Sequence, residues 1–105
     1  MTIKTLNISS DHDNFNLKNV FACIDPSLRV QVISNNSRTK NGNIEQGYQL
    51  VFIDCANEDV KKTFESLVIS FRLTCAHVDT ADYRGCVLNW PGVFVASRCA
   101  IESTQ

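Results

Sequence analysis

The stretch GYQLVFID, residues 47–54, constrains the fold of this chain more than any other part of it. Consecutive side chains of a strand point to opposite faces, and here both faces are apolar. Such a run is typical of a central strand of a sheet rather than an edge strand. The polar segment NNSRTKNGN, residues 35–43, precedes it as a loop between strands.

Other segments carry weaker strand patterns. TIKTLNIS, residues 2–9, alternates and contains β-branched residues, and LRVQVIS, residues 28–34, places its apolar side chains on one face. Near the end of the chain, CVLNW (86–90) and VFVAS (93–97) also favour strands. The dipeptide Pro91-Gly92 lies between these two and is a strong turn signal.

Two segments have the periodicity of amphipathic helices. The first is preceded by three candidate N-caps, Ser10, Asp11 and Asp13, and is ended by Pro26. Its apolar stripe, at the spacing i, i+3, i+4 and i+7, consists of Leu17, Val20, Phe21 and Ile24. The second segment, NEDVKKTFESLVISF (57–71), has Asn57 as its candidate N-cap and two acids in its first turn, which suits the helix dipole.

The predicted order is β-α-β-β-α-β, with an extra short C-terminal strand or hairpin. This order indicates an α+β fold, the ferredoxin-like plait, in which two helices cover one face of an antiparallel sheet. The 105 residues are expected to form one domain. The opposite face of the sheet is then free to bind another molecule.

The composition restricts the kind of protein. Hydrophobic residues make up 44% of the chain and charged residues 20%, and no apolar run reaches the length of a membrane helix. The first residues have no secretory-signal pattern, and the five cysteines are scattered, so we expect reduced thiols in an intracellular protein of the nucleus or cytoplasm. The net charge of -1 gives no basic excess for nucleic acid.

Several of these segments together resemble the RNA recognition motif (RRM) family. The resemblance lies in the spacing of LNI (6–8) at the end of the first strand, of LKNVF (17–21), and of GYQLVFIDCANEDVKKTFESL (47–67). In that family the third strand carries the motif K/R-G-F/Y-G/A-F-V-x-F/Y, whose aromatic side chains stack bases. The chain has Gly47, Tyr48 and Val51 at matching positions.

Other positions of the family motif differ. Gln46 stands in place of the phosphate-pairing cation, Gln49 in place of a small residue, and Leu50 and Ile53 in place of aromatics. In the first strand, Lys4 stands where the family usually has an aromatic residue. Stacking contributes about 1–3 kcal/mol per base, and two of the three usual stacking positions are not aromatic here. The resemblance therefore implies weak rather than strong RNA binding.

The resemblance implies a site for single-stranded RNA on the open face of the sheet. Tyr48 would stack a base, Leu50 and Phe52 would add apolar contact on the same face, and Val51 and Ile53 would point to the helices. The expected polar contacts to RNA come from Lys4, Arg38, Lys40 and Gln46. The alternatives for these residues are cross-strand packing for Tyr48, solvated loop cations, and a sheet face covered by residues 93–105.

No enzymatic motif is present. Cys75 and His77 are a close thiol–imidazole pair, but the ligand spacing of a zinc site is missing, so no metal, cofactor or catalytic residue is predicted. The expected function is an RRM-like module that binds single-stranded RNA weakly on the open sheet face, and the alternative is a protein–protein interaction module that does not bind RNA. A small standalone inhibitor or regulator that shares the plait is a further alternative.

Overall fold

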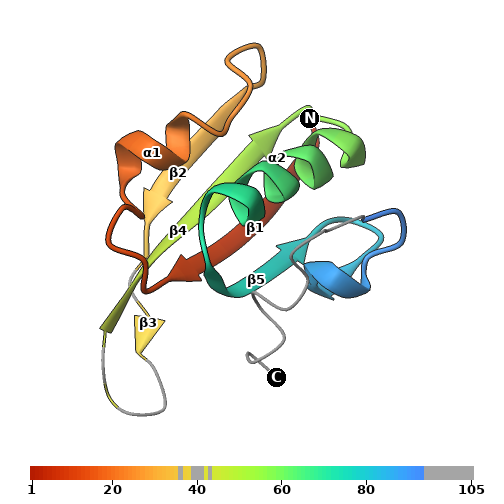
Figure 1. The fold of residues 1–105 in the computed structure, drawn as a ribbon. Coiled ribbons are helices and arrows are strands. Elements are labelled where there is room, and N and C mark those ends of the chain that lie inside the picture. Colours follow the sequence, from red (N-terminus) through yellow and green to blue (C-terminus); the bar gives the residue numbers. More distant parts are fainter. Residues whose placement is uncertain (36, 39–41, 43, 94–105) are drawn as a thin grey trace.

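The computed structural model describes residues 1–35, 37–38, 42 and 44–93, and Figure 1 shows the chain as a ribbon. Along the chain the elements are β1 (Ile3–Ser10), α1 (Leu17–Phe21), β2 (Val30–Ser34), β3 (Ser37–Arg38), β4 (Ile44–Ile53), α2 (Asn57–Ser70), β5 (Leu73–Asp79), β6 (Arg84–Cys86) and the 3₁₀ turn η1 (Val87–Asn89).

The strands form an antiparallel sheet in the order β2-β4-β1-β5-β6, and the short β3 pairs with the first residues of β4. The prediction of a central strand at residues 47–54 is confirmed, because β4 lies between β2 and β1. Both helices lie on one face of the sheet (Figure 1). The protein is therefore a small α+β structure built on an antiparallel sheet with two helices.

The core lies between that face and the helices. In β1 and β4 it takes the even-numbered positions, so that Leu6 lies opposite Leu50 and Ile8 opposite Tyr48 across the strand pair. Helix α2 adds four buried apolar side chains, Val60, Phe64, Leu67 and Val68. Burial of apolar area is the main stabilising term of such a fold, at about 25 cal/mol per Å².

Helix α1 is shorter than the apolar stripe indicates. Val20 and Ile24 are buried, while Leu17 and Phe21 are 46% and 47% exposed, so the stripe prediction is half wrong. The three candidate N-caps are also wrong: Asn16 caps the helix, its side chain accepting from the Asn19 N–H at 3.0 Å. Buried Phe15, just before the cap, fixes where the chain enters the helix.

The N-terminus of α2 differs from the prediction by one residue. Ala56 is the N-cap, and the predicted cap Asn57 is the first residue of the helix. The side chain of Asp59 accepts a hydrogen bond from the Ala56 N–H at 2.9 Å, which closes the first turn. An acid in this turn also faces the positive end of the helix dipole.

The final part of the sheet was not predicted correctly. The strand next to β1 is β5, directly after α2, and a shift of pairing register at Ser9 and Ser10 breaks its alternation. CVLNW is not a strand beyond Cys86, since its next three residues form η1. The turn at Pro91-Gly92 is confirmed: Gly92 has φ 89° and the Val93 N–H donates to the Trp90 carbonyl at 3.3 Å. Most of VFVAS lies outside the described residues.

Candidate functional site

The three apolar residues predicted to bind RNA share one face of β4, but it is the face that packs on the helices. Tyr48 is 5% exposed, and Leu50 and Phe52 are fully buried. The expectation that they lie on the open face is therefore wrong. The reason is the pairing of β4 with β1, which places Leu6 and Ile8 on the same face as these three residues. Together they are the more apolar face of the sheet, and this face is buried under the helices.

Tyr48 belongs to an aromatic cluster of the core. Its ring lies 5.3 Å from the ring of Phe15, and Phe15 lies 5.1 Å from Phe71 in an edge-on arrangement. Burial raises the pKa of the Tyr48 phenol, since the charged form is poorly solvated there. A ring enclosed in this way has no free surface for a base.

The predicted polar contacts are not brought together on one surface. Lys4 lies opposite Phe52 on the helix side, where its ammonium donates to the Cys55 carbonyl at 2.7 Å. The Gln46 amide donates to the Ser34 hydroxyl at 3.2 Å. The backbone of Arg38 pairs with that of Ile44, but its side chain and the whole of Lys40 lie outside the described part of the chain.

We define the open face as the face of the sheet opposite α1 and α2. Strand pairing assigns to it the odd-numbered residues of β1, β2 and β4 and their partners in β5 and β6. Its side chains are Ile3, Thr5, Asn7, Ser9, Gln31, Ile33, Glu45, Gln49, Val51, Ile53, Cys75, His77, Asp79, Arg84 and Cys86. None of these is Phe, Tyr or Trp.

Four aliphatic side chains cross the open face and form what we call the aliphatic band: Ile3, Ile33, Val51 and Ile53. Ile3 lies opposite Ile53 in the β1–β4 pair, and Val51 follows two residues earlier on β4. Ile33 is opposite Gln49, diagonally beside Val51. Ile3 and Ile33 are 45% and 48% exposed, so the band is accessible at both ends.

Neutral side chains flank the aliphatic band. Thr5, Asn7, Gln31 and Gln49 offer hydroxyl and amide groups that donate and accept hydrogen bonds without a charge. Among the described side chains of the open face, the cation is Arg84, which is paired with Asp79 at 3.3 Å. The described part of this face therefore has no unpaired arginine or lysine to follow a phosphate backbone.

A hollow of about 200 Å³ lies next to Gly47 on the open face and is lined by Asn7, Ile8, Ser9, Asn35, Tyr48 and Cys75. A Cβ at Gly47 would overlap the carbonyl oxygen of Asn35. The glycine that matched the family motif is thus explained by a close backbone approach at the end of β2. The Asn35 N–H also donates to the Gly47 carbonyl at 2.7 Å.

The Cys75 and His77 pair lies on this face, and no hydrogen bond joins the two side chains in the described part of the chain. Burial, with smaller effects of Cys86 and Glu45, raises the pKa of the Cys75 thiol, which opposes formation of a reactive thiolate. His77 is exposed and lies opposite Cys86. Within the described residues, no group of three His, Cys, Asp or Glu side chains is placed to hold a metal ion.

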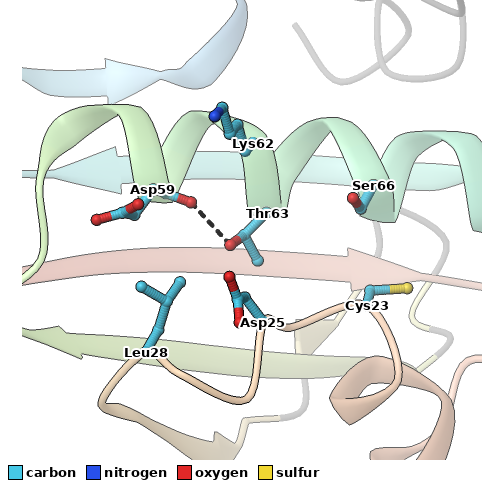
Figure 2. Close-up of a pocket in the computed structure, with 7 residues that line it drawn as sticks. All are labelled: Cys23, Asp25, Leu28, Asp59, Lys62, Thr63 and Ser66. Carbon is cyan, nitrogen blue, oxygen red and sulfur yellow. Dashed lines mark hydrogen bonds between the residues drawn. The ribbon is translucent and has the colours of Figure 1, made fainter.

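A second hollow lies on the helix side, between α2 and the loop that follows α1 (Figure 2). It measures about 90 Å³ and is lined by Cys23, Asp25, Leu28, Asp59, Lys62, Thr63 and Ser66. The Thr63 hydroxyl is already used, donating to the Asp59 carbonyl at 2.8 Å. No histidine lines this hollow, so its thiol and hydroxyls have no imidazole base beside them.

Strand pairing and the side-chain surroundings thus define a small α+β protein with an open sheet face. Comparison of the chain with protein-family models, with curated proteins and with solved structures found no match. Among the described helices, none is long and apolar enough to cross a membrane.

Sequence reasoning missed several residues of the open face, including Ile33, Gln49 and Val51. The signal that could have found them is in β1, where Thr5, Asn7 and Ser9 alternate with core residues and so indicate the polar side of the same sheet.

Proposed function

We propose that this chain is a ferredoxin-like plait that acts as a binding module without catalytic activity, and that its open face binds a protein partner rather than RNA. The plait is supported by the order β2-β4-β1-β5, since in that topology the first and third strands of a β-α-β-β-α-β chain are central. In this numbering those strands are β1 and β4.

The observation that carries the functional proposal is the aliphatic band. Aliphatic side chains that gather on a surface, rimmed by neutral polar groups, are typical of protein interfaces, where the centre is apolar and the rim is polar. Val51 and Ile53 would be at the centre of the contact, with Gln31 and Gln49 as hydrogen-bonding neighbours. A partner that covers this area would bury side chains now 45% to 48% exposed at the ends of the band.

The same observations weigh against RNA as the partner. Neutralisation of phosphates by Lys and Arg supplies most non-specific nucleic-acid affinity, and on the described open face Arg84 is paired with Asp79. Base stacking uses aromatic platforms, and Tyr48 is enclosed in the core. The family resemblance in the spacing of strands and helices therefore supports the plait more than it supports RNA binding.

Photo-crosslinking tests this proposal. A photoreactive residue is placed at Ile33, on the open face, and in a second protein at Ile69, a 77% exposed isoleucine of α2 on the helix side. We expect crosslinks to one saturable protein from position 33 and not from position 69. Unlabelled wild-type protein should compete for these crosslinks, and the Ile33→Glu protein should not.

A titration with mixed short single-stranded RNAs at low salt provides the second arm. Amide resonances of Gln49, Val51 and His77 should stay unchanged. Saturable shifts at these residues, combined with crosslinks from position 33 to RNA, would overturn the choice of a protein partner. Equal protein crosslinking from positions 33 and 69 would show that the open face is not a specific surface.

A further inference from the structure

A third hollow lies at the edge of the core, away from the aliphatic band. It measures about 290 Å³ and is lined by Asn57, Lys61, Asp82, Tyr83, Trp90 and Pro91. These residues come from the first turns of α2, from the β5–β6 turn and from the segment after η1. Side chains from three separate parts of the chain therefore converge on one space.

Lys61 presents a fixed cation to this hollow. Its ammonium donates to the Pro91 carbonyl at 2.5 Å and lies 4.7 Å from the centre of the Trp90 ring. That carbonyl belongs to the turn at Pro91 and Gly92, where Gly92 has φ 89°, a conformation that residues with a side chain rarely adopt. An ammonium has three N–H donors, and the carbonyl takes one of them.

Asp82 presents an anion to the same hollow. Its carboxylate accepts from the Thr80 hydroxyl at 2.6 Å, while the Thr80 hydroxyl accepts from the Asp82 and Tyr83 N–H groups at 3.3 and 3.0 Å. The hydrogen bond from Thr80 lowers the pKa of Asp82, so the carboxylate stays ionised near neutral pH. Further acceptor positions on its two oxygens remain open.

These opposite charges line one hollow, yet no ion pair within 4.0 Å joins them in the described structure. Lys61 forms an ion pair with Glu58 at 3.9 Å, and the Glu58 side chain is 73% exposed. Separated charges of opposite sign are complementary to a molecule that carries both signs at a short distance. A ligand of single charge would meet attraction at one end of the hollow and repulsion at the other.

Aromatic rings form the apolar wall of this hollow. Tyr83 and Trp90 are parallel, with an interplanar angle of 7° and centroids 6.0 Å apart. The Tyr83 hydroxyl donates to the Cys86 carbonyl at 2.7 Å, which holds the ring in position. The wall is therefore suited to an apolar group attached between the two charged ends of a ligand.

We propose that this hollow binds a small zwitterion, a free α-amino acid with an apolar side chain. The carboxylate of the amino acid binds the Lys61 ammonium, its ammonium binds the Asp82 carboxylate, and its side chain lies against Tyr83 and Trp90. Asn57 lies beside the Asp82 carboxylate in the same hollow, and its side-chain amide also lowers the pKa of Asp82. Its enclosed Oδ1 has no hydrogen-bond partner and is a further acceptor in the lining.

The chain has one tryptophan, so its indole N–H resonance and its fluorescence report directly on this hollow. The probe is L-leucine, titrated into the full chain. We expect a saturable shift of the indole resonance with a dissociation constant of about 1 mM, the range for a ligand with few contacts. L-leucinamide lacks the carboxylate and N-acetyl-leucine lacks the ammonium, and each should bind about tenfold more weakly or worse.

Charge-removing variants complete the test. Lys61→Met and Asp82→Asn should each weaken L-leucine binding by about tenfold or more, while Lys62→Met, the neighbouring exposed lysine of α2, should leave it unchanged. If Lys61→Met does not fold, the exposed Asp82→Asn variant and the two leucine analogues decide the matter. An unsaturated shift, or equal binding of leucine, leucinamide and N-acetyl-leucine, would overturn the proposal without affecting the open-face proposal.

Discussion

Gly47 is the residue of β4 whose backbone packs directly against the end of β2, and this close approach leaves no room for a side chain. A Cβ would overlap the Asn35 carbonyl oxygen, while the Asn35 N–H donates to the Gly47 carbonyl. We predict that Gly47→Ala lowers the free energy of unfolding by about 1–3 kcal/mol, because the two backbones must separate. Chemical denaturation measures this, with Gln49→Ala, two residues along on the open face, expected to stay within about 0.5 kcal/mol of wild type.

Tyr48 is a second residue whose role the structure changes. As a member of the core cluster with Phe15 and Phe71, it should stabilise the fold rather than bind a ligand. Tyr48→Ala is expected to lower the free energy of unfolding by about 3–5 kcal/mol, as other buried aromatic truncations do. A loss below about 1 kcal/mol would mean that the ring lies on the surface instead.

The buried Tyr48 phenol also predicts a pH dependence. Its pKa in the folded protein is raised above the ordinary value of about 10, while the unfolded chain has the ordinary value. The neutral phenol therefore contributes full stability below pH about 10, and this is lost as the pH rises through the folded pKa. Denaturation at pH 8 to 11 should show a smaller alkaline loss for Tyr48→Phe than for wild type.

At the scale of single elements, α1 depends on its cap more than on its length. It has only five residues, and the Asn16 side chain accepts the Asn19 N–H at 3.0 Å. We predict that Asn16→Ala lowers the free energy of unfolding by about 1 kcal/mol, and that Asn16→Asp keeps most of it. Equal stability of the two variants would show that the cap does not hold the helix.

The strands also show which features of the fold the sequence predicts and which it does not. The run from Gly47 to Asp54 indicates a central strand, and its alternation correctly places Tyr48 with Leu50 and Phe52. Alternation does not say which face meets the helices; that depends on pairing with β1, where Leu6 and Ile8 share their side. Strand β5 escaped prediction because the register shift beside Ser9 and Ser10 disrupts its period of two.

The hollow near Trp90 could not be predicted for a related reason. Lys61 and Asp82 are ordinary surface charges in the sequence, and Trp90 follows a segment that reads as a strand. Only the tertiary arrangement of α2, the β5–β6 turn and the Pro91-Gly92 turn brings them to one space. Sites built from residues far apart in the chain, without a local motif, leave no pattern for periodicity to detect.

At the scale of the whole molecule, the two faces of the sheet differ in composition and in role. One face of the sheet buries the aromatic and aliphatic core that stabilises the fold, and the other carries the aliphatic band with its neutral rim. A net charge of -1 fits a surface that recognises by shape and hydrogen bonding more than by attraction to phosphates. The central claim is that a protein binds this second face.

Affinity measurement with a matched pair of variants tests that claim most directly. Isothermal titration compares the partner crosslinked from position 33 with Ile33→Glu and with Ile69→Glu, since both replace an exposed isoleucine and add one negative charge. We predict that Ile33→Glu weakens binding by about tenfold or more and that Ile69→Glu binds as wild type. Unchanged binding of Ile33→Glu, or an equal loss in both variants, would contradict the account.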